Sequence, residues 1–335
     1  MTKPKVVVTH DLKFPVLDEL KKHAEVTELN KDYPLQGEEL TRSVAEADGV
    51  ICLLTDKFTG DVVEKLNKVK IISTVSAGYD HIDIEAATRK GIYVFNAADP
   101  LTISVAEFTF ALMLSVARRV VEGDRLIREG NWKSGWSLTF MLGYELRGKT
   151  LGIVGLGKIG KEVAKRARCF GMNVIYYSRT RKIDFEEEYK VVFKDFYSVL
   201  AESDFLVLSV ALTPETKNMI SKKEISLMKK DAFLINISRG AVVDEEALIE
   251  ALKKKVIAGA ALDVFQKEPL SKSSELVKLD NVVLTPHIAS ATYEARRGMA
   301  EQAVKNMLYA LQGVVNEECL VNKEVTKVRK LSKMI

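Results

Sequence analysis

Short runs of β-branched residues alternate with amphipathic stretches from one end of this 335-residue chain to the other. Parallel strands produce this pattern, because a helical crossover must separate each strand from the next and the helices bury both faces of the sheet. At roughly 150 residues per domain, the length favours about two domains. The sequence therefore predicts an α/β protein with two doubly wound parallel sheets.

The apolar runs fall into two series. The first hundred residues contain predicted strands at Lys5 to Thr9, Glu25 to Glu28, Gly49 to Leu53, Ile71 to Thr74 and Tyr93 to Phe95. A second series follows at Thr150 to Val154, Asn173 to Tyr177, Phe205 to Val210, Phe233 to Ile237, Ile257 to Ala261 and Val282 to Thr285. Six strands complete a doubly wound sheet. Helix signals lie between them, such as Ser221 with Glu224 in capping-box spacing, and Asp244 before a helix.

Two longer helical patterns, at about 101–128 and 292–311, do not fit either series of short crossovers. Gly313 closes the second pattern. We interpret both as segments that carry the chain between two lobes. This interpretation assigns residues 1–98 and 289–335 to one domain and residues 99–288 to the other, with a cleft between the two sheets.

Composition excludes several classes of protein. The chain is 47% hydrophobic and 29% charged, as ordinary globular proteins are. The longest apolar stretch, Phe108 to Ala117, is far shorter than the roughly 18 residues that span a bilayer. The N-terminus does not resemble a signal peptide, so we expect a cytoplasmic protein without a membrane partner. Its 50 basic and 46 acidic residues nearly balance, which does not indicate nucleic acid binding.

The cysteines Cys52, Cys169 and Cys319 lack the spacing of metal ligands. Each lies in an apolar or helical context. We therefore expect buried, reduced thiols and no metal site.

The motif Gly155-Leu156-Gly157-Lys158-Ile159-Gly160 is a GxGxxG between a predicted strand and a helix that begins near Lys158. This context is typical of a dinucleotide-binding fingerprint. Gly155 allows the tight turn, Gly157 lets backbone N–H groups approach a pyrophosphate, and Gly160 lets the helix pack closely. The helix N-terminus, at Lys158 and Ile159, faces the phosphate charge. The alternative is a glycine-rich turn that binds no ligand.

The next strand ends in Ser178-Arg179-Thr180-Arg181, where an NAD-binding domain usually presents an acid to the ribose hydroxyls. A hydroxyl and two guanidiniums can bind a 2′-phosphate, which a carboxylate would repel. This favours NADP(H) over NAD(H), with Ser178, Arg179 and Thr180 at the cofactor. In the alternative interpretation the arginines are solvated loop charges and cofactor choice is loose.

Four ionisable residues follow the carboxyl ends of later strands, the edge where an open α/β sheet binds its ligand: Arg239, Asp263, Glu268 and His287. Reduction of a carbonyl by hydride needs a proton donor for the oxygen, and the ordinary pKa of histidine suits His287 to this task. A carboxylate beside it, best supplied by Glu268, would favour imidazolium. Arg239 can hold a substrate carboxylate in a bidentate fork. Singly, each residue also has a structural interpretation, as a turn residue or a solvated charge.

These motifs together resemble the ordered signatures of the D-isomer-specific 2-hydroxyacid dehydrogenases. The resemblance rests on the fingerprint, Ser238-Arg239-Gly240 with Val242 and Asp244, Leu262-Asp263-Val264-Phe265 with Glu268-Pro269, and Thr285-Pro286-His287. It covers nearly the whole chain. The ending Tyr177-Ser178-Arg179-Thr180 most resembles the glyoxylate/hydroxypyruvate reductase branch.

The resemblance implies that Arg239, Glu268 and His287 form a catalytic triad and that Asp263 contacts the nicotinamide carboxamide. It also implies a substrate site for a small 2-oxo or 2-hydroxy acid. The residues of that site would be Leu53, Val75, Ser76, Ala77, Gly78, Arg239 and His287, with backbone N–H groups of residues 75–78 on the carboxylate. The implied architecture is a flavodoxin-like substrate domain, a Rossmann cofactor domain and a homodimer formed through the cofactor domain.

The expected function is NADPH-preferring reduction of glyoxylate or a similar acid such as hydroxypyruvate, with His287 as general acid/base. Two alternatives stay open. One is another dehydrogenase of this family, of phosphoglycerate or D-lactate type. The other is a dinucleotide-sensing binding protein that resembles transcriptional corepressors.

The segment Asn131 to Leu146 has no clean helical or strand period, although it is rich in large apolar residues: Trp132, Trp136, Leu138, Phe140, Met141 and Leu142. Such residues are enriched in interface cores. We predict that this segment packs across a symmetric dimer, and the resemblance places Trp136 toward the partner's substrate site. The alternative is an arm folded onto its own lobe.

Overall fold

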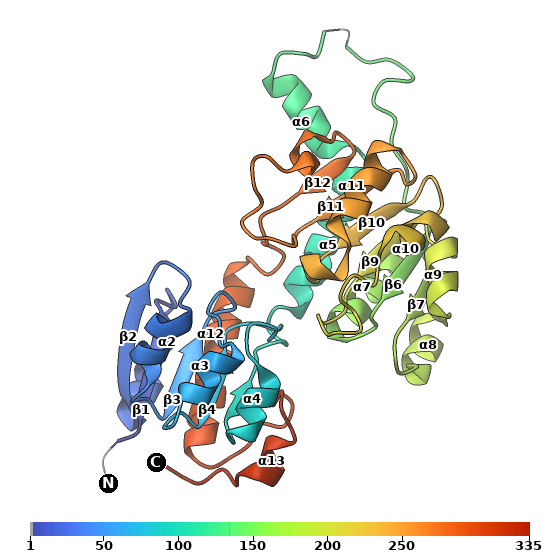
Figure 1. Ribbon diagram of the computed structural model, residues 1–335. Coiled ribbons are helices and arrows are strands. Elements are labelled where there is room, and N and C mark those ends of the chain that lie inside the picture. The colour runs from blue at the N-terminus through green and yellow to red at the C-terminus, as the bar shows by residue number, and fades with distance from the viewer. Residues whose placement is uncertain (1–2, 134) are drawn as a thin grey trace. The chain divides into compact units, whose positions relative to one another are not determined.

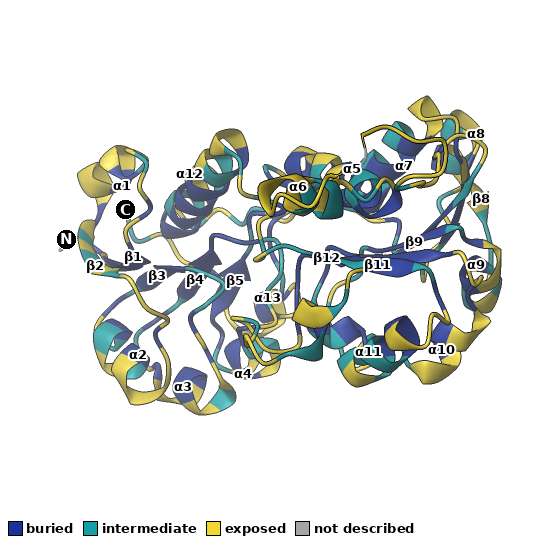
Figure 2. Cartoon of the chain, turned by 90° about the horizontal axis from the view of Figure 1, so that it is seen from above, coloured by how far each residue is buried: buried dark blue, intermediate teal, exposed yellow. Residues whose placement is uncertain are grey.

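The computed structural model describes residues 3–133 and 135–335, and these divide into two compact units. The first unit consists of Met1–Leu101 and Thr292–Ile335, and the second of Thr102–Ala291 (Figure 1). In each unit, helices cover both faces of a parallel sheet (Figure 2). The expected class of fold is therefore confirmed.

Among the described residues, the first unit has a five-stranded parallel sheet in the order β2-β1-β3-β4-β5. Its strands are β1 (Lys5–His10), β2 (Glu25–Lys31), β3 (Gly49–Cys52), β4 (Ile71–Thr74) and β5 (Tyr93–Phe95). Its helices are α1 (Asp18–His23), α2 (Gly37–Val44), α3 (Gly60–Lys65), α4 (Ile84–Arg89), α12 (Tyr293–Leu311) and α13 (Val325–Val328). This strand order is flavodoxin-like. Every residue of β3 and β4 is buried, which explains their continuous apolar runs.

Helix α12 brings the chain back to the first unit. Thr292 caps its N-terminus by accepting a hydrogen bond from the N–H of Ala295 at 3.1 Å. At its C-terminus the N–H of Gly313 donates to the carbonyl of Ala310. The helix packs on β4, where the Ser73 hydroxyl donates to the carbonyl of Ala303 at 2.9 Å. The predicted end of the helix at Gly313 is thus present.

The described part of the second unit forms a seven-stranded parallel sheet in the order β12-β11-β10-β9-β6-β7-β8. Its strands are β6 (Thr150–Val154), β7 (Asn173–Tyr177), β8 (Val192–Phe193), β9 (Phe205–Leu208), β10 (Phe233–Asn236), β11 (Gly259–Leu262) and β12 (Val282–Leu284). The order reverses at β6, so the carboxyl ends of β6 and β9 flank the topological switch point. Strand β8 was not predicted, because its two residues are too few to show a period.

The helices of the second unit are α5 (Thr102–Ala117), α6 (Val120–Arg128), α7 (Lys158–Cys169), α8 (Ile183–Tyr189), α9 (Phe196–Glu202), α10 (Lys222–Leu227) and α11 (Glu245–Lys253). The capping box at Ser221 and the Asp244 cap are both present. A core cluster lies between the sheet and helices α9 to α11, and it includes Leu206, Leu234 and Leu248.

The single helix expected at about 101–128 is wrong, because Arg119 adopts a left-handed φ of 55° that separates α5 from α6. Helix α5 is largely buried, whereas no residue of α6 is. Helix α6 instead projects from its unit (Figure 1). The helical period continues across the break without glycine or proline, so the sequence gives no local signal for it.

The burial of the three cysteines is only partly as expected. Cys52 and Cys319 are buried as expected, but the expectation was wrong for Cys169, which is exposed at the end of α7. The helical context alone did not show which face of α7 this residue occupies.

Within residues 3–133 and 135–335, no helix combines the length and apolarity needed to cross a membrane.

Candidate active site

The GxGxxG motif forms the turn between β6 and α7. Gly155 has a φ of 101°, and a Cβ there would lie 2.4 Å from the carbonyl oxygen of Ser209. A Cβ at Gly160 would lie 2.3 Å from the carbonyl oxygen of Gly155, so α7 packs directly on the turn. At Gly157 a Cβ would meet nothing within 4 Å. The first turn of α7 carries no acidic side chain, so its dipole suits the phosphates of a dinucleotide.

The loop after β7 is closed by its own hydrogen bond. The Ser178 hydroxyl donates to the carbonyl of Thr180 at 2.6 Å, and Arg179 is exposed beside them. Glu215, in the loop after β9, has a pKa below its usual value. The Thr213 hydroxyl is the main cause, and the charge of Arg179 adds to it. Arg179 therefore lies near the loop after β9, although β6 separates β7 from β9 in the sheet.

Arg181 is engaged elsewhere. Its Nη2 lies 2.8 Å from Oε2 of Glu186, and its guanidinium lies over the ring of Phe193. Glu186 also accepts a hydrogen bond from the Tyr176 hydroxyl at 2.6 Å. Burial, followed by the contact with Glu186, raises the pKa of Tyr176 to about 12, so this phenol remains a donor. The interpretation that two guanidiniums bind the phosphate needs correction, because Arg181 instead fixes the base of the loop.

The predicted ionisable residues follow three neighbouring strands. Arg239 follows β10, Asp263 directly follows β11, and His287 follows β12. A Cβ at Gly240 would lie 1.8 Å from the carbonyl carbon of Phe265, so the turn after β10 packs directly against the segment after β11. Only glycine permits this approach. The packing brings Arg239 near Glu268, whose pKa its charge helps to lower.

His287 and Glu268 are in direct contact, with 2.8 Å between Nδ1 of the imidazole and Oε2 of the carboxylate. The other oxygen, Oε1, accepts the N–H of Phe265 at 3.0 Å. Burial raises the pKa of Glu268. The hydrogen bond and charge of His287, with smaller contributions from Phe265 and Arg239, outweigh burial and hold this pKa below its usual value. The carboxylate is therefore ionised at neutral pH and faces Nδ1 of the imidazole.

The backbone of His287 is in an uncommon conformation, with a φ of 56°. Strain of this kind persists where surrounding contacts impose it. Here the N–H of His287 donates to the carbonyl oxygen of Asp263 at 2.9 Å. The buried Asp263 carboxylate also accepts from the Thr285 hydroxyl at 2.7 Å and from the N–H groups of Ile288 and Ala289 at 2.9 and 2.8 Å. Asp263 thus anchors the segment that carries His287, and its contact with nicotinamide stays a prediction.

Asn236 was missed by the sequence analysis. It is buried at the end of β10, and its Oδ1 accepts the N–H of Ser238 at 3.0 Å while its Nδ2 donates to the carbonyl of Arg239 at 3.0 Å. Arg239 Nη1 donates to the carbonyl of Ser238 at 2.9 Å. A buried polar residue at the end of an apolar strand was the available signal.

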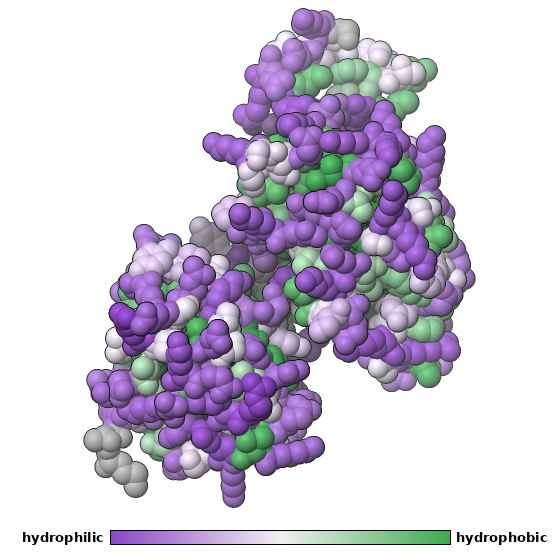
Figure 3. Space-filling model, viewed as in Figure 1, coloured by the Kyte–Doolittle hydropathy of each residue, from purple (hydrophilic) through white to green (hydrophobic). Residues whose placement is uncertain are grey.

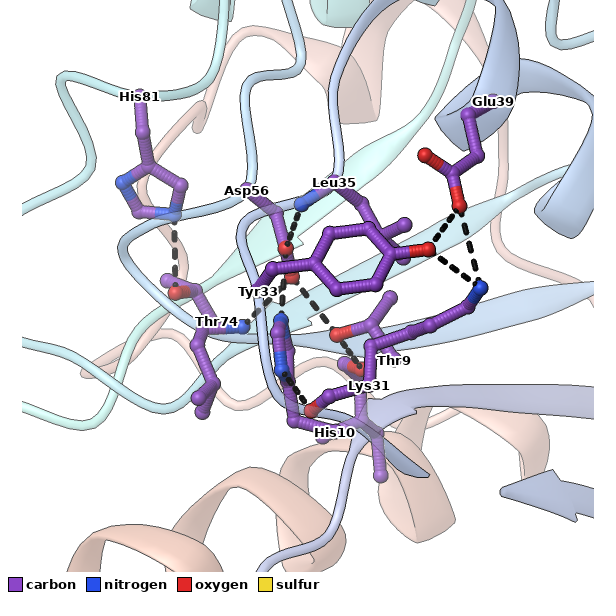
Figure 4. A network of polar contacts seen from close by, with 11 residues as sticks. Thr9, His10, Lys31, Tyr33, Leu35, Glu39, Asp56, Thr74 and His81 are labelled. Atoms are coloured by element: carbon purple, nitrogen blue, oxygen red, sulfur yellow. Dashed lines mark hydrogen bonds and ion pairs between the residues drawn. The ribbon is translucent and has the colours of Figure 1, made fainter. Parts of the chain in front are cut away.

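Five of the seven predicted substrate residues, Leu53 and those of the Val75–Gly78 loop, lie in the first unit, at the carboxyl ends of β3 and β4. Leu53 follows β3, and its N–H donates to Oδ2 of Asp56 at 3.2 Å. The Ser76 hydroxyl donates to the carbonyl of Gly78 at 2.7 Å, which closes the Val75–Gly78 loop. Thr74 supports this loop, with Oγ1 lying 2.8 Å from Ser76 Oγ. It also lies 3.1 Å from Nε2 of His81 (Figure 4).

In sum, the second unit brings together Arg239, Glu268 and His287, and the first unit holds Leu53 and the Val75–Gly78 loop. Among the described residues, no group of three or more His, Cys, Asp or Glu side chains could hold a metal ion.

Comparisons with known proteins agree with this geometry. Residues 110–289 match the family model of the D-isomer specific 2-hydroxyacid dehydrogenase, NAD binding domain. A glyoxylate reductase of Thermococcus litoralis is 52% identical over 328 residues, which cover 96% of this chain and 98% of the relative.

Two solved structures are also similar. A protein of Pyrococcus horikoshii has a TM-score of 0.87 at 41% identity, with 100% of both chains covered. An NADPH-dependent glyoxylate/hydroxypyruvate reductase of Sinorhizobium meliloti, solved with NADP and malonate, has a TM-score of 0.84 at 28% identity, covering 97% of this chain and 98% of that one. This chain therefore belongs to the D-isomer specific 2-hydroxyacid dehydrogenase family and is an NAD(P)-dependent enzyme.

Proposed function

We propose that this protein reduces glyoxylate, or a similar small 2-oxo acid such as hydroxypyruvate, to the 2-hydroxy acid and prefers NADPH to NADH. The contact of 2.8 Å between His287 Nδ1 and Glu268 Oε2 carries the proposal, because it makes the imidazole a proton donor at the ligand-binding edge of the sheet. The activities named for the relatives from Thermococcus litoralis and Sinorhizobium meliloti support the choice of substrate.

The residues of the second unit fit a nicotinamide dinucleotide. The open space at Gly157 and the N-terminus of α7 suit the pyrophosphate, while Ser178, Arg179 and Thr180 would hold the 2′-phosphate. Asp263 would lie by the nicotinamide. When bound, this cofactor supplies the hydride that reduces the 2-oxo carbon.

Residues of the protein itself bind the substrate and supply the proton. Backbone N–H groups of Val75–Gly78 bind the substrate carboxylate and Leu53 lines the site. Arg239 pairs with the carboxylate and polarises the carbonyl. As the carbon accepts hydride, protonated His287 gives its Nε2 proton to the carbonyl oxygen, so the product carries the hydroxyl and the imidazole is left neutral. Glu268 holds Nδ1–H throughout, and solvent returns the proton.

We also propose that the first unit is the substrate domain, that the second is the cofactor domain, and that a cytoplasmic homodimer forms through the second. Trp136, Leu138 and Leu142 are 85%, 78% and 64% exposed on the segment beyond α6. Hydrophobic side chains gather there (Figure 3). This exposure favours an interface over an arm folded onto its own lobe. The position of Trp136 near a partner's substrate stays a prediction.

The test is loss of NADPH absorbance with glyoxylate, hydroxypyruvate, pyruvate and longer 2-oxo acids, each repeated with NADH. We expect glyoxylate or hydroxypyruvate to give the highest kcat/KM. The variant His287→Ala should lower kcat at least roughly a hundredfold, the usual scale of general acid catalysis. NADPH binding, followed by its fluorescence, should not change in that variant.

The matched control is His23→Ala, since His23 is exposed on α1 and lies outside the proposed site. Its activity should equal that of the wild type. Binding of NADPH without turnover of any acid in the panel would overturn the proposal in favour of a dinucleotide-sensing protein. Best turnover of pyruvate or of phosphorylated acids would point to the D-lactate or phosphoglycerate type.

A further inference from the structure

A buried ion pair in the first unit has no part in the reaction described above. Asp56, in the loop between β3 and α3, is fully buried, and His10, at the end of β1, is 6% exposed. Nε2 of His10 lies 2.8 Å from Oδ1 of Asp56 (Figure 4). Burying two charges costs solvation energy, and well-packed apolar residues would often serve stability as well or better. Stability alone is therefore a poor reason for this pair.

The hydrogen-bond partners fix the charge of both residues. Nδ1 of His10 lies 2.8 Å from the carbonyl oxygen of Lys31, which can only accept. Since Nε2 faces a carboxylate, both ring nitrogens must carry a proton. In agreement, the hydrogen bond with Asp56 raises the pKa of His10. Burial raises the pKa of Asp56, but the hydrogen bonds from His10, Thr9 and Leu35 outweigh it and leave this pKa below its usual value.

The Asp56 carboxylate joins three segments at the carboxyl edge of the sheet. Oδ2 accepts from the Thr9 hydroxyl at 2.7 Å, at the end of β1. Oδ1 accepts the N–H of Leu35 at 3.0 Å, in the segment between β2 and α2. Oδ2 also accepts the N–H of Leu53 at 3.2 Å, just after β3. Four directed bonds, including the one from His10, therefore hold the start of the predicted substrate segment.

The connection continues to the second substrate segment. The N–H of Asp56 donates back to the carbonyl of Leu53 at 3.2 Å, which closes the turn 53–56. Directly before this turn, the carbonyl of Cys52 accepts the N–H of Val75 at 2.9 Å. One backbone hydrogen bond thus connects the residue before the turn to the start of the Val75–Gly78 loop.

We propose that Asp56, paired with His10, is a positioning residue for the 2-oxo acid, which holds Leu53 and the Val75–Gly78 loop where they receive the substrate. This inference rests on the proposed function. It predicts that disruption of the pair weakens substrate binding, while cofactor binding and the proton transfer step, which belong to residues of the second unit, are retained.

The experiment compares Asp56→Asn and His10→Gln with the wild type at a temperature well below unfolding. Loss of a charge-assisted hydrogen bond corresponds to roughly a tenfold effect or more, so the KM for glyoxylate should rise by about that factor. The value of kcat and the dissociation constant of NADPH alone should stay within about threefold, because no group on the reacting atoms is removed. Asp61→Asn and His23→Gln, at exposed positions of the same unit, are the matched controls.

Binding of oxalate to the protein–NADPH complex gives a second measurement that needs no turnover. Its affinity should fall by the same factor as KM rises. A lower melting temperature with unchanged KM and unchanged oxalate affinity would show a purely structural pair and overturn the inference. If Asp56→Asn does not fold, the KM and oxalate affinity of His10→Gln test the inference. This variant should fold, because Asp56 still accepts hydrogen bonds from Thr9, Leu35 and Leu53. Failure of the proposed function would appear separately, as absence of turnover by the wild type.

Discussion

At the scale of single residues, the most informative feature is how the imidazole of His287 is held. Its backbone is fixed by Asp263, and its Nδ1 is fixed by Glu268. Asp263 accepts three hydrogen bonds from Thr285, Ile288 and Ala289, whereas Nδ1 of the imidazole pairs with Glu268. The two carboxylates therefore have separate contacts: Asp263 orients the loop, and Glu268 binds Nδ1 of the ring.

The first prediction concerns this charge. Because the pKa of Glu268 lies below its usual value, the residue is anionic across the working pH range and favours protonated His287. Glu268→Gln removes the anion, so the fall in activity with rising pH should move to lower pH. The measurement is kcat/KM for glyoxylate against pH.

The control for this prediction is Glu275→Gln. Glu275 is also a paired carboxylate of the second unit, since Lys253 and Lys278 lower its pKa to about 2, but it lies outside the proposed site. Its pH profile should match the wild type. If the profile of Glu268→Gln is also unchanged, Glu268 does not stabilise the proton donor.

At the scale of elements, the loop between β7 and α8 is the segment that should decide the choice of cofactor. Glu186 in α8 accepts hydrogen bonds from both the Tyr176 hydroxyl of β7 and the Arg181 guanidinium. This anchored base leaves residues 178–180 as a short projecting turn. The loop thus separates a structural arginine from Arg179, which is proposed to bind phosphate.

The second prediction is a reversal of cofactor preference in the double variant Ser178→Asp with Arg179→Ala. The new carboxylate repels a 2′-phosphate and can accept hydrogen bonds from the free ribose hydroxyls of NADH. Arg179→Ala alone should weaken NADPH use by roughly tenfold or more, because a charge-assisted hydrogen bond is lost, and should hardly change NADH use. The measurement is kcat/KM for both cofactors.

Arg181→Ala is the matched comparison, because it removes a guanidinium two positions away. Since Arg181 binds Glu186, this variant should affect the two cofactors equally. If Arg179→Ala also lowers kcat/KM equally for both cofactors, Arg179 supports the fold. The absence of an acid after β7 would then not indicate a preference for NADPH.

At the scale of the whole molecule, the segment beyond α6 exposes large apolar residues. Helix α6 has no buried residue, and five apolar residues in the described part of the following segment are exposed: Trp132, Trp136, Leu138, Phe140 and Leu142. Exposed apolar residues that gather in one segment mark association surfaces.

The third prediction is that light scattering at micromolar concentration gives twice the mass of one chain. Leu138→Ser combined with Leu142→Ser should shift the protein toward the monomer, because two apolar contacts are lost from the interface core. Leu227→Ser, which changes an exposed leucine of α10 in the same unit, should leave the mass unchanged. A wild-type mass equal to one chain would rule out the dimer.

The sequence by itself determined the two-sheet architecture, because buried parallel strands require continuous apolar runs, and these runs are visible in the sequence. It also determined the fingerprint turn, since the glycine requirement at Gly155 is local, and it found Arg239, Glu268 and His287 because strand ends define the ligand edge. These features depend on residues that are close in sequence or on a simple rule of sheet topology.

Only the tertiary structure decided the rest. The left-handed backbone of Arg119 separates α5 from α6, and Arg181 pairs with Glu186 of α8. The pair of His10 and Asp56 joins residues 46 positions apart. Periodicity and composition report which side chains face the core, but not which donor meets which acceptor. That pairing is set by the packing of segments distant in the chain, so it is visible only in three dimensions.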